Sequence, residues 1–191
     1  SGSGAVGYSA NGVQTLTFDG NGLTVTSGSV TIADKIIHSG DTNTSIRFPA
    51  ADTFTVETGG SERARVDSSG RLLVAHTASI GGEKLQVNTT GSSPAGFNSW
   101  NNGTDPAFLA LRKSRGGSAG TYTVVQDGDG LGAISFQGAD GDSFANGARI
   151  QASVDGTPGD GDMPARLTFL TSADGTTNLT ERMRIDSSGR V

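Results

Sequence analysis

The stretch Glu62–Leu72, ERARVDSSGRL, occurs a second time as Glu181–Val191, ERMRIDSSGRV. Eight of the eleven positions are identical at a separation of 119 residues, and the three that differ exchange one apolar residue for another. A match that keeps both residue identity and apolar character indicates one structural unit that is used twice.

Each copy has the pattern of a β-hairpin. Alternate residues of a strand face opposite sides, so we expect one largely apolar face and one face of Arg and Asp. In the first copy these faces carry Glu62, Ala64 and Val66 on one side and Arg63, Arg65 and Asp67 on the other. The Asp-Ser-Ser-Gly sequence that follows fits a type I turn, with Asp first and Gly fourth. We expect the charged groups to pair across strands or between subunits.

Short alternating runs and turn dipeptides surround the two copies. Asp-Gly occurs seven times and Asn-Gly four times, and both accept the backbone angles of tight turns. Apolar residues alternate at Leu16/Phe18, Leu23/Val25, Val30/Ile32, Ile46/Phe48, Phe54/Val56, Leu85/Val87, Ile134/Phe136, Ala148–Val154 and Leu167/Phe169. Period-2 alternation predicts half-buried strands, and we find no convincing helical period. The sequence therefore predicts an all-β chain of short strands and hairpins.

The composition excludes several classes. The 191 residues include 30 Gly and no Cys, are 33% hydrophobic and carry a net charge of -5. Without Cys there is no disulfide scaffold and no Cys-ligated metal centre. The acidic balance argues against nucleic acid as a partner, and no apolar run is long enough for membrane insertion.

We expect four parts. Residues 1–38 form short Thr/Gly-rich strands, 39–90 the first repeat unit, 91–106 a loop or linker, and 107–191 a second, longer repeat unit. The chain begins with Ser1 and stops as its second hairpin starts to return. This arrangement suggests a fragment of a longer protein, with the second unit truncated at its C-terminal end.

The candidate chemical groups are few. His38 and His76 show no metal-ligand spacing, so we expect exposed histidines at strand ends. Four acids could supply the carboxylate pair of a glycoside hydrolase: Asp127, Asp129, Asp140 and Asp142. Gly directly follows three of them, which favours turn capping instead.

Two acidic loops and one aromatic residue remain. Residues 127–130 and 155–162 offer oxygens for Ca²⁺ but match neither an EF-hand nor a calcium-binding nonapeptide repeat. Trp100 lies in an Asn/Gly/Ser-rich loop, where it could stack on a sugar ring or pack beneath its own loop. The sequence predicts no catalytic residue, no cofactor and no metal site, and Trp100 is the candidate receptor contact.

The repeat resembles a recurring unit of bacteriophage tail-fibre and tail-spike shafts. The resemblance rests on Glu-Arg-x-Arg-Val/Ile-Asp-Ser-Ser-Gly-Arg followed by a short apolar strand, and the runs at 34–49 and 166–175 also look like those that precede it in such fibres. It covers residues 34–90 and 107–191. The resemblance implies an elongated homotrimeric fibre of intertwined or side-by-side β-strands, and it marks a structural segment rather than an activity.

The implied function is a structural segment of a phage tail fibre or tail spike, extracellular and on the virion, which spaces and supports host-receptor attachment. Its partners would be two further copies, other tail or virion proteins, and host cell-surface polysaccharide as a further candidate. Two alternatives stay open: a glycan- or receptor-binding module that uses the hairpin loops of residues 100–162, and a polysaccharide-depolymerising spike. Leu, Ile, Val and Phe make up only 39 residues, which agrees with a core shared among three chains.

Overall fold

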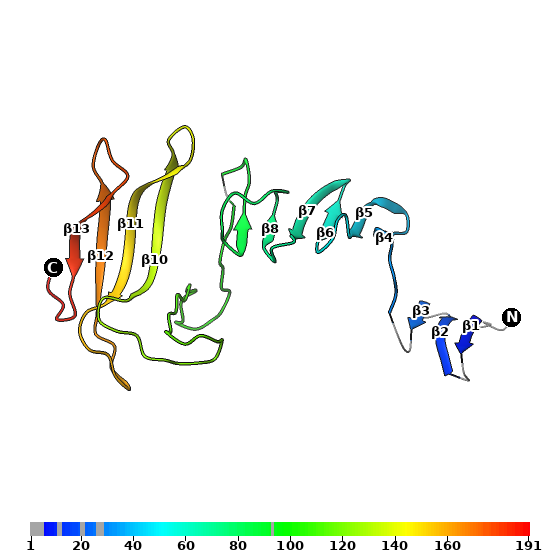
Figure 1. Cartoon of the computed structure of the whole chain (residues 1–191), viewed down its shortest axis with the longest axis horizontal. Helices are drawn as coiled ribbons and strands as arrows, with labels where there is room; N and C mark the ends of the chain where they lie inside the picture. The colour runs from blue at the N-terminus through cyan, green and yellow to red at the C-terminus, as the bar shows by residue number, and fades with distance from the viewer. Residues whose placement is uncertain (1–5, 11–12, 20–21, 26–28, 93) are drawn as a thin grey trace. The chain divides into compact units, whose positions relative to one another are not determined.

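The computed structural model describes residues 6–10, 13–19, 22–25, 29–92 and 94–191. In these ranges the chain consists of strands, turns and loops (Figure 1), and no helix there could cross a membrane. The all-β prediction is confirmed. The chain divides into two compact units, Ser1–Gly96 and Phe97–Val191, and the division falls inside the expected linker.

A three-stranded antiparallel sheet comes first in the chain. It contains β1 (Val6–Ala10), β2 (Val13–Asp19) and β3 (Gly22–Val25), in that order. The alternating runs at Leu16/Phe18 and Leu23/Val25 fall in β2 and β3, as predicted. The turn dipeptides expected around these strands begin at Asn11, Asp19 and Asn21, and each includes a residue outside the described ranges.

A six-stranded sheet follows in the same unit. Its strands are β4 (Lys35–His38), β5 (Asp41–Arg47), β6 (Phe54–Thr58), β7 (Ser61–Val66), β8 (Leu72–Val74) and β9 (Leu85–Val87). They are ordered as in the sequence; neighbours are antiparallel except β8 and β9, which are parallel.

One predicted strand of this unit is wrong. Residues 29–34, which include the run Val30/Ile32, form no strand. The chain bends at 33–34, and the four residues after the bend, β4, pair with β5 instead. The amide of Phe48 donates to the carbonyl of Asp34 at 2.7 Å, so the bend is fixed against the end of β5. The six-stranded sheet thus begins four residues before the expected start of the first repeat unit.

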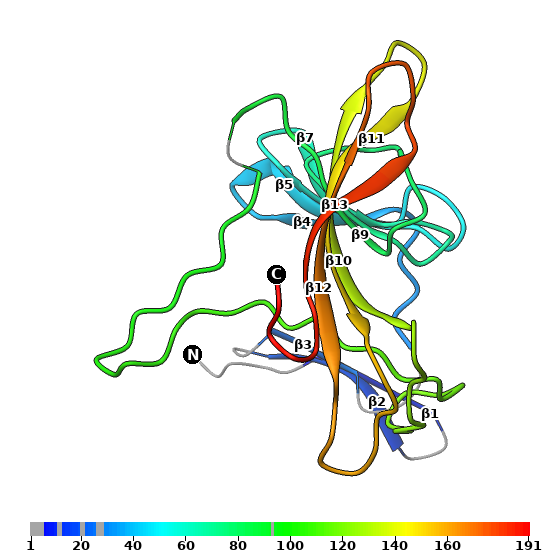
Figure 2. The same cartoon turned by 90° about the vertical axis from the view of Figure 1, so that its left-hand side faces the viewer.

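The second unit contains one antiparallel sheet of four strands (Figure 1, Figure 2). Its strands are β10 (Gly130–Ala139), β11 (Phe144–Val154), β12 (Ala165–Ser172) and β13 (Leu179–Ile185). Each strand pairs with the next along the chain, so β10 and β13 are the edges.

The structural repeat is longer than the eleven matching residues. In β4–β7 one cross-strand row reads Ile36, Ile46, Val56, Ala64. In β10–β13 the corresponding row reads Ile134, Ile150, Phe169, Met183. Apolar residues therefore occupy the same register positions in four successive strands of each unit.

A bulge at the same place in both copies overturns one expectation. Val56 pairs with Ala64 but Glu57 pairs with Glu62, which leaves Arg63 as an extra residue in β7. An extra residue reverses the facing of everything beyond it. Glu62 therefore shares a face with Arg65 rather than with Ala64, and the prediction that it lies on the apolar face is wrong. In β13 the extra residue is Arg182, the equivalent of Arg63.

Candidate assembly surface

One face of the six-stranded sheet is apolar from edge to edge. Two cross-strand rows make it up: Ile36, Ile46, Val56, Ala64, Val74 and Val87 in one, and Phe54, Val66, Leu72 and Leu85 in the other. The Phe48 ring packs against Phe54 with 5.9 Å between centroids. Most of these side chains are exposed, Ile36 by 53% and Leu85 by 59%. An apolar sheet face normally packs on a second layer, and this face has none in the described part of the unit.

The four-stranded sheet has the same kind of face. Its apolar side carries the row from Ile134 to Met183 and a second row, Gly132, Ala152, Leu167 and Ile185. Ile134 is 50% exposed and Met183 is 42% exposed. Part of the face is covered from its own chain, because Leu109 and Leu111 border a hollow of about 230 Å³ over this sheet. Leu111 lies directly above Gly132, where a Cβ atom would come within 2.7 Å of the Leu111 Cβ.

The opposite face of the six-stranded sheet carries a group of paired polar side chains. Arg47 binds Asp34 at 3.0 Å and Glu57 at 3.1 Å, and the Ser45 hydroxyl donates to Glu57 at 3.0 Å. Hydrogen bonds to Asp34 and then to Glu57 raise the pKa of Arg47. These polar groups have partners within the chain, so the apolar face is the one that lacks a counterpart.

Arg65 and Arg184 of the repeat form ion pairs within their own strands rather than across strands. Arg65 binds Glu62 at 2.6 Å and Arg184 binds Glu181 at 2.5 Å, in each case three residues away. The bulge makes this possible because it turns the Glu to the Arg side. The expectation of cross-strand ion pairs is therefore wrong for these residues.

The bulge residues also repeat their contacts. Arg63 donates to the Thr58 hydroxyl at 2.9 Å, and Arg182 donates to the Thr171 hydroxyl at 3.0 Å. Each bond joins the bulge to the preceding strand or its turn, so both bulges are held in the same way.

The Asp-Ser-Ser-Gly turns are held by their Asp carboxylates. Asp67 accepts hydrogen bonds from the amides of Ser69 at 2.9 Å and Arg71 at 3.0 Å, and from the Arg71 guanidinium at 2.7 Å. Gly70 has a φ of 67°, and its amide donates to the Asp67 carbonyl. The predicted turn, with Asp first and Gly fourth, is confirmed. The amide and then the guanidinium of Arg71 hold the pKa of Asp67 below its ordinary value.

The second turn repeats these bonds with the same geometry. Asp186 accepts from the amides of Ser188 at 2.9 Å and Arg190 at 3.0 Å, and from the Arg190 guanidinium at 2.8 Å. It differs in one contact, because the amide of Ser187 donates to Asp155, which also binds Arg166 at 2.9 Å. The second hairpin is thereby attached to the end of β11.

The acids considered for catalysis or Ca²⁺ binding mostly support turns. Asp127 accepts from the amide of Gly156, and Asp140 accepts from the amide of Ser143. Asp129 binds the Arg115 guanidinium at 2.6 Å and the amide of Gln126 at 2.9 Å, which together place its pKa well below the usual range. Across the described ranges, no three His, Asp or Glu side chains gather as metal ligands would.

The remaining predicted residues lie apart from one another in the chain. His38 ends β4 and is exposed. His76 is half-buried after β8, where its ring contacts the Ala78 carbonyl at 2.6 Å and the Asn88 amide at 2.7 Å. Trp100 is 91% exposed in an irregular segment.

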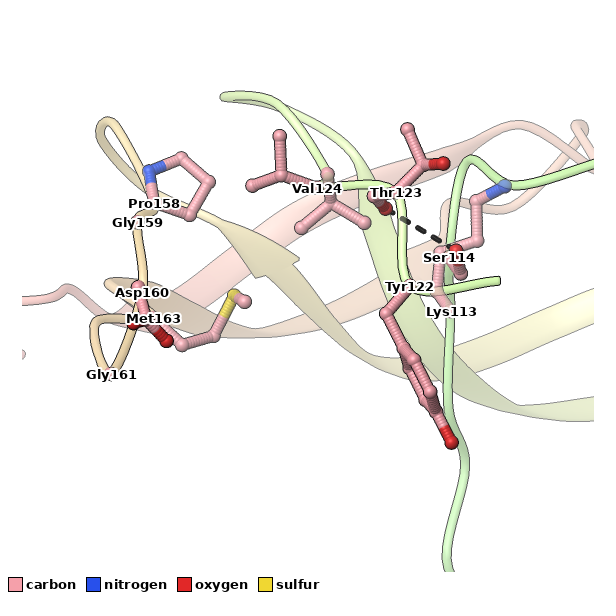
Figure 3. A pocket seen from close by; sticks show the side chains of 11 residues that line it. Lys113, Ser114, Tyr122, Thr123, Val124, Pro158, Gly159, Asp160, Gly161 and Met163 are labelled. Carbon is pink, nitrogen blue, oxygen red and sulfur yellow. Dashed lines mark hydrogen bonds between the residues drawn. The ribbon is translucent and has the colours of Figure 1, made fainter. Parts of the chain in front are cut away.

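A hollow of about 550 Å³ lies in the region 100–162 that the sequence analysis considers for receptor binding, and it extends to Met163 (Figure 3). It opens between segment 113–125 and loop 158–163, and its lining includes Lys113, Tyr122, Val124, Asp160 and Met163. The Tyr122 ring is 94% exposed. The one sequence signal was the alternation of Thr and larger residues at 121–124, which shows no feature of a binding motif. Trp100 does not line this hollow.

Comparison with known proteins gives a likeness of fold. No family model and no curated protein matches the chain. The carboxy-terminal domain of the bacteriophage T5 L-shaped tail fibre is similar over 98% of this chain and 77% of its own, with a TM-score of 0.55 and 16% identity. The structure of the same domain with its intramolecular chaperone domain has a TM-score of 0.56 and 17% identity to this chain. The chain spans about half, 53%, of the length of that structure. At this identity the likeness concerns the fold.

Proposed function

We propose that this chain is a structural segment of a phage tail fibre or tail spike, and that three copies assemble with their apolar sheet faces against one another. The observation that carries the proposal is the apolar face itself, which recurs in both units at the same register positions and is exposed in each. Exposed apolar surface of this extent marks an interaction site in soluble proteins. The fold shared with the T5 tail-fibre domain supports the same assignment.

Assembly also explains the small core of the single chain. Among the described side chains, only Leu73, Val125 and Val154 are buried and hydrophobic. Burying one large aliphatic or aromatic side chain contributes about 1.5–3 kcal/mol, so moving both faces out of water is the main stabilisation open to this sequence. In this role the segment acts on the virion, spacing and supporting the attachment of the particle to host polysaccharide, in contact with other tail or virion proteins. No catalytic step is part of the proposal.

Two adjacent substitutions in β10 test the assembly. Ile134 is half-exposed on the apolar face, and its neighbour Ser135 is exposed on the other face. Light scattering after size exclusion should give about three times 19.3 kDa for the native chain and for Ser135→Asp. Ile134→Asp should give a lower mass, since a carboxylate cannot be buried unpaired in an apolar interface. A folded native monomer near 19.3 kDa would refute the assembly.

A receptor-binding module within residues 100–162 is a second candidate, favoured by the hollow beside Tyr122. An exposed aromatic ring next to Lys113 and Asp160 offers a stacking face and charged hydrogen-bonding groups, which suit a pyranose sugar. Binding to a glycan array that disappears with Tyr122→Ala and persists with Ser135→Ala would support it. Loss with Trp100→Ala instead would place the contact at Trp100, and the absence of any binding would remove this candidate.

A further inference from the structure

Residues 107–113 form a stretch that runs straight yet pairs with no strand. Residues 105–116 contain neither a turn nor a bend, and no residue among them has a positive φ. Leu109 and Leu111 border the same hollow while Ala110 does not, which is the alternation of an extended strand. Within the described chain, no backbone amide or carbonyl of 107–113 takes part in a backbone hydrogen bond. This segment has the conformation of a β-strand without a ladder.

The segment is also apolar and exposed. Phe108 is 77% exposed, Leu109 65% and Leu111 50%. An extended apolar stretch with free amides and carbonyls is a template for pairing with another strand. A soluble protein normally blunts or covers such a stretch, so its presence here indicates a partner.

The same unit offers an unpaired edge. β10 has only β11 as a neighbour, and its pairing with β11 is regular from Gly132 to Phe136. Its ten residues, GLGAISFQGA, include no charged residue and no Pro, which are the usual means of protecting an edge. The opposite edge, β13, carries Glu181, Arg182 and Arg184. Of the two edges, β10 is therefore the one open to a further strand.

The segment does not occupy this edge in its own chain. Leu111 lies over Gly132 on the apolar face, where a Cβ atom added to Gly132 would come within 2.7 Å of the Leu111 Cβ, so it sits above β10 rather than beside it. Paired strands lie about 4.8 Å apart in the plane of the sheet. The free edge and the free strand belong to the same unit but are not paired with each other.

We infer that residues 107–113 of one copy add to the free edge of β10 in a neighbouring copy. The pairing rests on the proposed assembly and specifies which strands exchange between chains. It satisfies the backbone groups of the segment and protects the uncharged edge. It also places Leu109 and Leu111 on the apolar face beside Ile134, where the assembly buries them.

Engineered disulfides test the pairing cleanly, because the chain has no Cys of its own. Ala110 faces away from Leu109 and Leu111, as Ala133 and Ser135 face away from Ile134, so these positions share a face in the pairing. Chains with Ala110→Cys and chains with Ala133→Cys or Ser135→Cys, distinguished by a mass tag, would be refolded together and mildly oxidised. Paired strands bring facing Cβ atoms to about 5 Å, within disulfide reach.

The expected product is a disulfide-linked pair of one chain of each kind, from at least one of the two mixtures. The control is Ala110→Cys mixed with Ala173→Cys, which lies after β12 and should stay unlinked. A trimer by light scattering that yields no mixed link in either mixture would overturn the inference and leave the proposed function standing. A monomer by light scattering would refute the proposed assembly, and with it the pairing that depends on the assembly.

A second measurement needs no substitution. In the assembled protein, the amides of 109–113 should exchange with deuterium about tenfold or more slowly than in unassembled chain, because ladder hydrogen bonds protect them. The segment could also pair with β10 of its own copy. A double variant with Ala110→Cys and Ala133→Cys in one chain tests this alternative. If that chain closes only an internal disulfide, β10 of the same copy is the partner and the inference is wrong.

Discussion

The carboxylates of Asp67 and Asp186 each fix a turn by binding an amide two residues away and an Arg four residues away. Two positions 119 residues apart thus repeat one set of bonds to within about a tenth of an ångström. The Asp-Ser-Ser-Gly-Arg motif is explained by this geometry, since it requires an acceptor at the first position, positive φ at the fourth and a guanidinium at the fifth. At the residue scale the repeat therefore encodes a turn.

The stability of the protein should therefore depend on pH in the acid range. Backbone amides and then the Arg guanidinium lower the pKa of Asp67 and of Asp186 in the folded protein. An unfolded Asp titrates near a pKa of about 3.9, and a carboxyl with a lower folded pKa stabilises the fold above that value. We expect the urea unfolding midpoint to be level between about pH 7 and pH 5 and to fall as the pH drops below about 4.

Substitutions can separate the contribution of these two turn carboxylates to stability from that of the other acidic residues. Asp67→Asn with Asp186→Asn should lower the midpoint at neutral pH and flatten its decline in acid. Asp174→Asn is the control, because Asp174 also precedes a turn Gly but its carboxylate accepts no hydrogen bond in the described part of the chain. An acid decline as steep in the double variant as in the native chain would contradict this account.

At the scale of strands, the alternation of apolar residues predicted where β5, β6, β9 and β10–β12 lie, because apolar residues alternate along at least part of each strand. The bulges at Arg63 and Arg182 could not be predicted in this way. An extra residue in one strand depends on how its neighbour pairs, and the sequence pattern of a single strand does not contain that information. For this reason the sequence pattern predicts the wrong face for Glu62 and does not predict its ion pair with Arg65.

The candidate surface was only partly predictable for a related reason. The apolar side of each strand could be read from the sequence, whereas the alignment of these sides into rows is set by cross-strand register. Segment 107–113 shows the limit most clearly, since its Phe-Leu-Ala-Leu sequence has no strict alternation. The unpaired strand and the Tyr122 hollow emerged only from the arrangement of the second unit.

The polar side of the six-stranded sheet contains one buried anchor. Leu73 in β8 is 1% exposed, next to Leu72, which is 42% exposed on the apolar side. Leu73→Ala should lower the free energy of unfolding by about 2–5 kcal/mol, because it removes a fully buried side chain and leaves a cavity in its place. Leu73→Met keeps the volume and should cost less than about 1.5 kcal/mol. Urea titration at a fixed chain concentration measures both, and equal losses would show that the site is not close-packed.

At the scale of the whole molecule, folding and assembly should be one process. Only three hydrophobic side chains are buried among the described residues of a single chain. In the proposed assembly, most of the stabilising apolar surface would become buried between copies. Mass action then makes the stability of the chain depend on its concentration. We expect the thermal midpoint to rise with each tenfold increase in chain concentration, and Ile134→Asp to unfold at a lower temperature than Ser135→Asp at every concentration.

The choice of signal decides whether this measurement is informative. Trp100, the single Trp, is 91% exposed in the folded chain, so its fluorescence would change little on unfolding. Far-ultraviolet circular dichroism follows the strands themselves, and light scattering on the same samples follows the assembled mass. The two transitions should coincide, since a sheet with one bare apolar face gains its second layer only from another copy. A midpoint that is independent of concentration, or strands that persist after the assembled mass is lost, would mean that each chain buries its apolar faces by itself.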